Sequence, residues 1–170
     1  FSLSNIPDRP GIAAQIFEKL SEASINVDLI IQATNDGNNN DITFTVSELE
    51  IKKTIEQCEL ITNQLGGEYN LKTNMTKLSI QGAGIMGRPS VSADLFDTLS
   101  QANINVRLIA TSEIKVSCVI EINNIPKVVR FVAEKFKLSD TQIFVNPINE
   151  KHDQPEVRGI ALDKNQVQVS

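Results

Sequence analysis

The sequence predicts an α+β protein made of two tandem copies of one small unit. Each copy is expected to be a ferredoxin-like βαββαβ sandwich, with its helices on one face of an antiparallel sheet. Residues 6–30 match residues 85–109 without a gap, so that Arg9 corresponds to Arg88 at an offset of 79 residues. In each copy the spacing of apolar residues switches between the period of a strand and that of a helix. A period this long exceeds a solenoid repeat and matches a complete small domain.

In the first copy, residues 1–6 alternate apolar and polar side chains, as a half-buried strand does. The turn cluster at residues 7–11 contains Pro10, which suits the first turn of a helix, and apolar residues then recur at helical spacing at Ile12, Ile16, Leu20 and Ala23. Asp36-Gly37 indicates a hairpin. The predicted elements are a strand at 1–6, a helix at 12–23, strands at 25–33 and 41–46, a helix at 51–65 ended by Gly66-Gly67, and a short strand at 69–72.

The second copy follows the same order, with a shorter hairpin at Ser112-Glu113. Two right-handed crossovers on one antiparallel sheet give the ferredoxin-like arrangement. Because a unit of this size buries little surface alone, we expect the copies to associate with each other or with those of a second chain. The predicted elements are a strand at 77–81, a helix at 89–102, strands at 104–110 and 114–120, and a helix at 127–136. The expected domain limits are 1–74 and 75–146, followed by a linker and strand segment at 147–170.

Composition excludes several classes of function. The 170 residues are 41% apolar and 22% charged, as in a packed globular protein. The net charge of −5 argues against binding to nucleic acid, which requires a basic face. No apolar run approaches about 18 residues, so no transmembrane helix and no membrane partner are expected. Cys58 and Cys118 lack metal-site spacing and lie in apolar patterns, so we interpret them as reduced core residues of a cytoplasmic protein.

The motifs resemble those of a known family. Residues 5–13 (Asn-Ile-Pro-Asp-Arg-Pro-Gly-Ile-Ala) and 27–32 (Val-Asp-Leu-Ile-Ile-Gln) resemble the first ACT domain of aspartate kinases. Residues 77–86 and 109–117 resemble the second. The tail at 156–170 is similar to the segment that precedes a first ACT domain, which suggests the cyanobacterial kind of aspartate kinase with more than one ACT pair. The resemblance implies a catalytic kinase domain before residue 1.

The turn before the first helix of each copy is the candidate binding site. A helix start presents free backbone N–H groups and a positive dipole, which suit a carboxylate. Gly11 and Gly87 allow a ligand to approach the backbone closely. Asp8 supplies a carboxylate for an ammonium group, and Asp28 and Gln32 are expected on the adjacent strand. Together these groups suit a free amino acid.

Structural explanations stand beside this interpretation. The turn at residues 7–11 could simply cap a helix, and Asp28 could be a surface charge. Asn26 and Asn105 occupy the same place in both copies and could terminate a loop between helix and strand. The asparagines at 38–40 are typical of a turn.

The family resemblance implies sites for threonine or lysine at interfaces between ACT domains, allosteric feedback inhibition of a kinase domain in cis, and a homodimer formed through the ACT domains. ATP and Mg²⁺ would belong only to the absent kinase domain, so no cofactor is expected in this chain. One side of the first site would be Asp8, Pro10, Gly11, Ile12, Ala13 and Gln32, faced by Asn103, Asn105 and Val106 of a second repeat. A second site would comprise Met86, Gly87, Ser90, Val91, Ser112 and Glu113.

No catalytic residues are expected in this chain, because it has no Gly-x-x-x-x-Gly-Lys phosphate loop, no Cys/His pair and no metal-ligand cluster. Gly87 stands where Asp8 stands and Arg107 where Asp28 stands, so the two sites need not share a ligand. Two alternatives remain open: a stand-alone pair of ACT domains that senses a ligand without a kinase, and a dimerisation module that binds no ligand.

Overall fold

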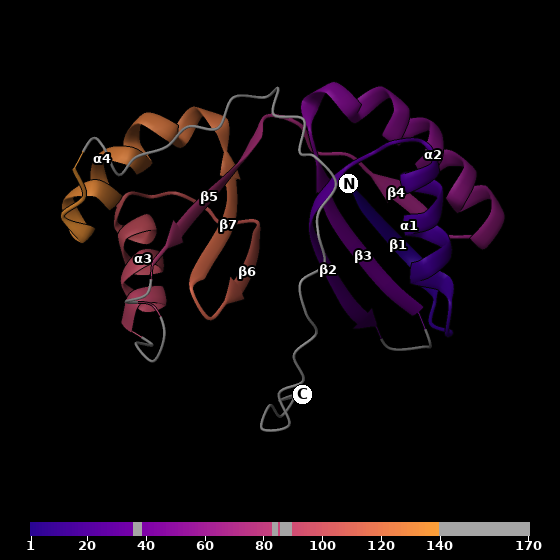
Figure 1. Cartoon of the computed structure of the whole chain (residues 1–170), viewed down its shortest axis with the longest axis horizontal. Helices are drawn as coiled ribbons and strands as arrows, with labels where there is room; N and C mark the ends of the chain where they lie inside the picture. Colours follow the sequence, from indigo (N-terminus) through magenta and orange to yellow (C-terminus); the bar gives the residue numbers. More distant parts are fainter. Residues whose placement is uncertain (36–38, 83–84, 86–89, 140–170) are drawn as a thin grey trace.

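The computed structural model describes residues 1–35, 39–82, 85 and 90–139, and it places them in two α/β units (Figure 1). In each unit the helices cover one face of an antiparallel sheet, and the two sheets turn their other faces toward each other across the middle of the molecule. The α+β fold of two ferredoxin-like units is therefore confirmed. None of the helices in these ranges has the length and apolar character needed to span a bilayer.

The first unit contains every predicted element. Its sheet has the strand order β2-β3-β1-β4, in which all neighbouring strands are antiparallel. Two helices connect these strands as the ferredoxin-like topology requires. The elements are β1 (Ser2–Pro7), α1 (Ile12–Glu22), β2 (Val27–Asn35), β3 (Asn39–Val46), α2 (Ile51–Leu65) and β4 (Glu68–Asn70).

The second unit repeats this arrangement with the strand order β5-β7-β6. The last strand predicted for this copy would fall after residue 139, outside the described residues. The last strand of the first sheet, β4, ends at Asn70, and the first strand of the second sheet, β5, begins at Met75. We propose that the domain boundary lies between them. The elements are β5 (Met75–Gln81), α3 (Ser90–Gln101), β6 (Leu108–Ser112), β7 (Lys115–Glu121) and α4 (Ile125–Phe136).

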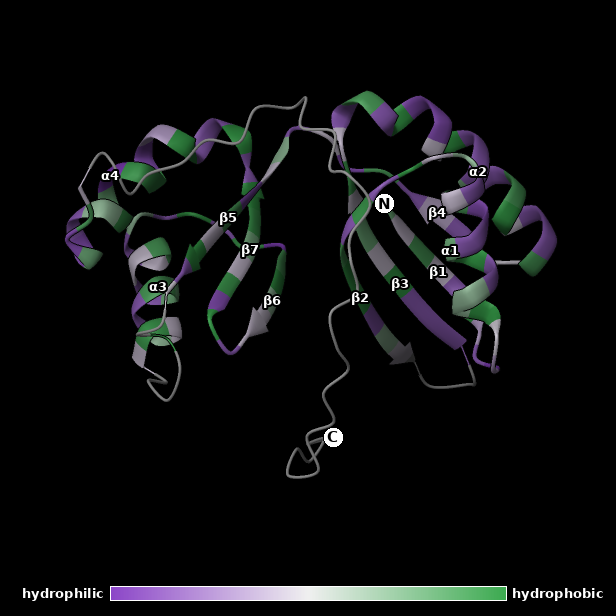
Figure 2. Ribbon diagram, viewed as in Figure 1, coloured by the Kyte–Doolittle hydropathy of each residue, from purple (hydrophilic) through white to green (hydrophobic). Residues whose placement is uncertain are grey.

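Each unit has a core of its own between its sheet and its helices. In the first unit, Phe44 is fully buried and stacks on Phe1 with ring centroids 5.7 Å apart. Helix α1 contributes Ile12, Ile16 and Leu20, three of the four residues that the helical spacing predicted; the fourth, Ala23, follows the helix and is partly buried. The helices are amphipathic: Figure 2 shows that they carry both hydrophobic and hydrophilic residues. The largest fully buried side chains of the second core are Leu95, Leu99, Ile120, Val116 and Val128.

The two cysteines occupy separate cores, Cys58 on α2 and Cys118 on β7, and both are free thiols. Burial raises the pKa of each thiol to about 11, because the ionised form would be poorly solvated. Both side chains are therefore neutral at pH 7 and behave as small apolar residues.

Both copies end their first helix with the same left-handed turn. Ser24 has φ 55° and Asn103 has φ 51°, and they are separated by the repeat offset. Ile25 N–H donates to Leu20 C=O, and Ile104 N–H donates to Leu99 C=O, as in a helix-terminating Schellman turn. The strands predicted to begin at residues 25 and 104 therefore begin later, at Val27 and Leu108, because the turn uses the preceding backbone.

Gly67 allows the backbone at the start of β4 to lie close to β1. Its φ is +88°, and a Cβ atom added there would lie 2.3 Å from the backbone oxygen of Ser4. Gly66 also has a positive φ, +83°, but its added Cβ would meet nothing within 4 Å. The two neighbouring glycines thus share backbone strain but differ in steric contact.

Substitution of these glycines separates the two effects. Gly66→Ala is expected to lower the free energy of unfolding by about 1–3 kcal/mol, because alanine is strained at this φ. Gly67→Ala is expected to lower the free energy of unfolding further, by about 3 kcal/mol or more, because β4 must also move away from β1. Urea denaturation measures both. Equal losses would show that the close approach to Ser4 is unimportant.

Candidate functional site

The loop between β1 and α1 leaves the start of α1 open. Gly11 precedes the helix with φ 91°, and no side chain caps it. Ile12 N–H donates to Arg9 C=O at 3.3 Å and Gln15 N–H donates to Gly11 C=O at 3.0 Å. The first-turn N–H groups of Ala13 and Ala14 lie between these two and have no preceding helical turn to accept from them. The helix start therefore offers donors and a partial positive charge to a ligand.

A cavity of about 440 Å³ lies at this helix start. It brings together six of the predicted effector residues from the loop, the helix and strand β2. It also contains three residues that the sequence interpretation did not select, from the loop and strand β3. The predicted residues are Asp8, Pro10, Gly11, Ile12, Ala13 and Gln32, and the additional ones are Arg9, Asn40 and Ile42.

Asn40 is the most informative of the additional residues. It was interpreted as part of a turn, but it lies in β3 and is only 5% exposed. Its Nδ2 donates to Oδ1 of Asp8 at 2.8 Å. Asn40 alternates in phase with Ile42 and Phe44, both buried, and this spacing was the signal that could have placed its side chain inside.

The residues predicted to face this cavity from a second repeat lie elsewhere in the chain. Asn103 occupies the left-handed turn after α3, and Asn105 is exposed just beyond it. Val106 is half-buried and packs against the core of the second unit. None of these three lines the cavity beside Asp8, so within a single chain that cavity has only one of its two predicted sides.

The second predicted site lies partly outside the described residues and stays a prediction. Met86 and Gly87 lie outside those residues. Ser90 and Val91 begin α3, while Ser112 ends β6 and Glu113 follows in the exposed turn. These four side chains line neither of the two cavities described here.

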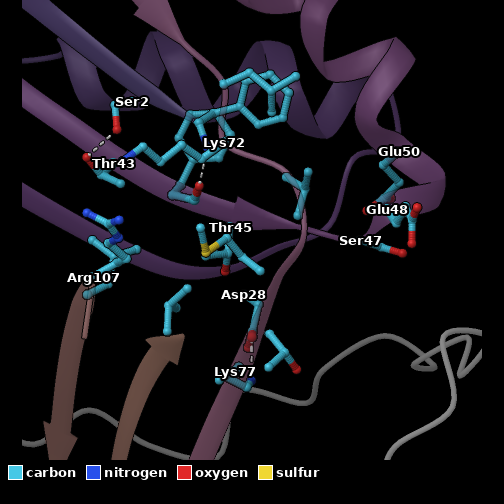
Figure 3. A pocket seen from close by; sticks show the side chains of 18 of the residues that line it. Ser2, Asp28, Thr43, Thr45, Ser47, Glu48, Glu50, Lys72, Lys77 and Arg107 are labelled. Carbon is cyan, nitrogen blue, oxygen red and sulfur yellow. Dashed lines mark hydrogen bonds and ion pairs between the residues drawn. The ribbon is translucent and has the colours of Figure 1, made fainter. Parts of the chain in front are cut away.

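A larger cavity, of about 920 Å³, separates the two units. It is formed by the faces of both sheets that carry no helix, and Figure 3 shows side chains from both units pointing into it. Asp28 of β2 forms an ion pair with Lys77 of β5, which links the units directly (Figure 3). Arg107 also lines this cavity and pairs with Glu121 at 3.5 Å. The structure therefore places Asp28 away from the cavity that contains Asp8 and Gln32.

Comparison with known proteins identifies the family. A family model described as the ACT domain matches residues 4–59 and 78–136, one segment in each unit. The chain belongs to the ACT-domain family. The two matched segments correspond to the two copies recognised from the internal repeat, and together they cover most of the described chain.

The relatives are aspartate kinases and their regulatory subunits. The ligand-free regulatory subunit of aspartate kinase from Thermus thermophilus is 35% identical, with a TM-score of 0.74 over 79% of this chain and 90% of that one. The aspartate kinase of Synechocystis is 33% identical, with a TM-score of 0.82 over 93% of this chain and 28% of that one. The aspartokinase of T. thermophilus is 36% identical over 138 residues. This chain is thus similar to the regulatory part of these enzymes.

The chain is much shorter than the curated relatives. It spans 34% of the length of the T. thermophilus aspartokinase and 34% of the aspartate kinase from Stutzerimonas stutzeri, to which it is 35% identical. The part that matches is the tandem ACT pair.

The ion pair between Asp28 and Lys77 is expected to set the distance between the two units. Both side chains are partly exposed, 50% and 32%, so the pair contributes at most about 1 kcal/mol to folding. Lys77→Met should leave the melting temperature nearly unchanged. It should widen the distribution of interatomic distances that small-angle X-ray scattering gives at low salt. The difference from wild type should vanish at high salt, where the wild-type pair is screened.

Lys72→Met is the matched control, because Lys72 lines the same cavity and carries the same charge. A scattering curve of Lys72→Met that changes as much as that of Lys77→Met would show that total charge, rather than the ion pair, controls the separation.

Proposed function

We propose that this ACT pair is the effector-sensing region of an aspartate kinase and that it binds a free amino acid, threonine or lysine, in the cavity beside Asp8. The observation that carries the proposal is that the uncapped start of α1 and Asp8 line the same cavity. The backbone N–H groups of the helix start can donate to the carboxylate of an amino acid, and the Asp8 carboxylate can accept from its ammonium group. A volume of about 440 Å³ falls within the range of about 300–1,000 Å³ typical of small-molecule sites.

A second copy of the chain would complete this site. Ile30 of β2 and Ile109 of β6 are separated by the repeat offset and are 52% and 48% exposed. Each lies on an edge strand, opposite a buried residue, so both face the side that carries the helices. Edge strands with exposed apolar residues are ready to pair with another chain. Ile30 precedes Gln32 by two residues on the same face, so a partner that covers Ile30 also borders the cavity.

Regulation would follow from a difference in affinity between two arrangements of the ACT layer. An effector shifts an equilibrium only as far as it binds one state better than the other. We propose that the effector-bound arrangement biases a kinase domain in the same enzyme toward its inactive state, giving feedback inhibition. ATP and Mg²⁺ would be bound by that kinase domain, and the two reduced thiols fit a cytoplasmic enzyme.

Effector binding is tested by calorimetry and thermal melting with threonine and with lysine. A ligand that binds only the folded chain raises its stability by RT ln(1 + [L]/Kd), about 2.7 kcal/mol at 100 times Kd. At least one of the two amino acids should therefore raise the melting temperature and release or absorb heat. No response to either would favour the dimerisation module without a ligand.

Asp8→Asn tests where the effector binds. Asparagine keeps an oxygen that can accept from Asn40 but removes the charge that would hold an ammonium group. Because a hydrogen bond to a charged group contributes about 1.5–3 kcal/mol, the affinity should fall about tenfold to a hundredfold. Glu18→Gln, on the exposed side of α1, is the control and should bind as the wild type does. An unchanged affinity in Asp8→Asn would place the effector elsewhere.

The dimer is tested by light scattering after size-exclusion chromatography. Wild type should elute with the mass of two chains. Ile30→Lys should raise the dissociation constant of the dimer at least about tenfold, because burying an unpaired ammonium group is costly. Leu60→Lys is the control, since Leu60 is 55% exposed on α2 and lies away from β2. A monomeric wild type, or equal behaviour of the two variants, would contradict pairing through β2.

A further inference from the structure

Asn40 carries a buried polar atom that the chain itself does not satisfy. Its side chain is 5% exposed, and its Oδ1 has no hydrogen-bond partner among the described residues. An unsatisfied acceptor in such a place destabilises the empty protein, since buried polar groups are normally hydrogen-bonded. Asn40 also lines the cavity beside Asp8, so a ligand in that cavity can reach this atom.

The orientation of the Asn40 amide follows from its neighbour. Nδ2 donates to Oδ1 of Asp8 at 2.8 Å. The opposite orientation would place the carbonyl oxygen of Asn40 against the Asp8 carboxylate, two acceptors in contact. Asp8 therefore holds the amide with Oδ1 as the free atom, and the group that satisfies it must be a hydrogen-bond donor.

The cavity is thus lined by groups of opposite polarity. The start of α1 offers backbone donors, while Asp8 and Asn40 Oδ1 offer acceptors. A simple anion would satisfy only the helix start and leave Oδ1 without a partner. An ammonium group has three donors, so it can bind Asp8 and Asn40 at the same time. The carboxylate of a zwitterion can satisfy the backbone donors while its ammonium group satisfies Asp8 and Asn40.

We infer that Asn40 is a specificity-determining residue of this site: its Oδ1 accepts a hydrogen bond from the α-ammonium group of the effector. The site then selects α-amino acids against carboxylates that lack the amine. This inference rests on the proposed function, since it concerns the same cavity. It applies to the first copy only, because the residue that corresponds to Asp8 in the second is Gly87, which has no carboxylate to orient an amide.

Asn40→Leu is the decisive variant, because leucine has a similar size and no polar atom. The melting temperature without ligand should equal or exceed that of wild type, since the unsatisfied acceptor is removed and the exposed Asp8 can be solvated. The affinity for threonine or lysine should fall about tenfold or more. Asn39→Leu makes the same change one residue away in β3, outside the cavity, and should bind as wild type does.

A double-mutant cycle separates direct contact from an effect through Asp8. If Asn40 contacts the ligand, Asp8→Asn combined with Asn40→Leu binds threonine more weakly than Asp8→Asn alone. The loss caused by Asn40→Leu should also be much smaller for 3-hydroxybutyrate, which keeps the carboxylate and hydroxyl groups of threonine but lacks the amine. Chemical shifts of isotope-labelled protein measure these weak affinities.

The outcomes are distinguishable. If wild type binds neither amino acid, the proposed function fails. If wild type binds one of them and Asn40→Leu binds it equally well, the inference about Asn40 is overturned while the proposed function stands. A double variant no weaker than Asp8→Asn would likewise overturn it, because Asn40 would then act only by positioning Asp8.

Discussion

Among the described residues, helices cover only one face of each sheet (Figure 1), and most other features of the structure follow from that constraint. The uncovered faces turn toward each other and enclose the larger cavity, where Asp28 and Lys77 join the units. The uncovered edges leave Ile30 and Ile109 in solvent. Two small sandwiches that bury only one face each gain stability mainly by adding neighbours, since their separate cores are small.

Local pattern was sufficient for most of the fold. The apolar spacing of α1 predicted its buried residues Ile12, Ile16 and Leu20, because the apolar stripe of an amphipathic helix is visible in the local sequence. The predicted start of β6 was wrong because the turn at Asn103 is followed by β-branched residues, which favour a strand but lie before the strand begins at Leu108. That turn is specified by backbone hydrogen bonds to Leu99 and Ser100, which composition does not reveal.

The candidate site was predictable where its residues are adjacent in sequence. Residues 8–13 lie in one loop and helix start, so their proximity needed no knowledge of the fold. Asn40 comes from another strand, and only the register of β3 against β1 brings it to Asp8. Asp28 was grouped with Gln32 because both were expected on the strand adjacent to the loop. An irregularity in β2 between Val27 and Ile30 turns Asp28 toward the other cavity.

The charge difference between the copies also makes the two halves of the chain non-equivalent. Asp28 and Arg107 occupy the same position in the repeat, and both line the cavity between the units. Asp28 pairs with Lys77 across the cavity, while Arg107 pairs with Glu121 of its own unit. Two identical copies of the first unit would instead place a carboxylate on each side of the cavity, where like charges repel. The two halves of the chain are therefore not interchangeable at this repeated position.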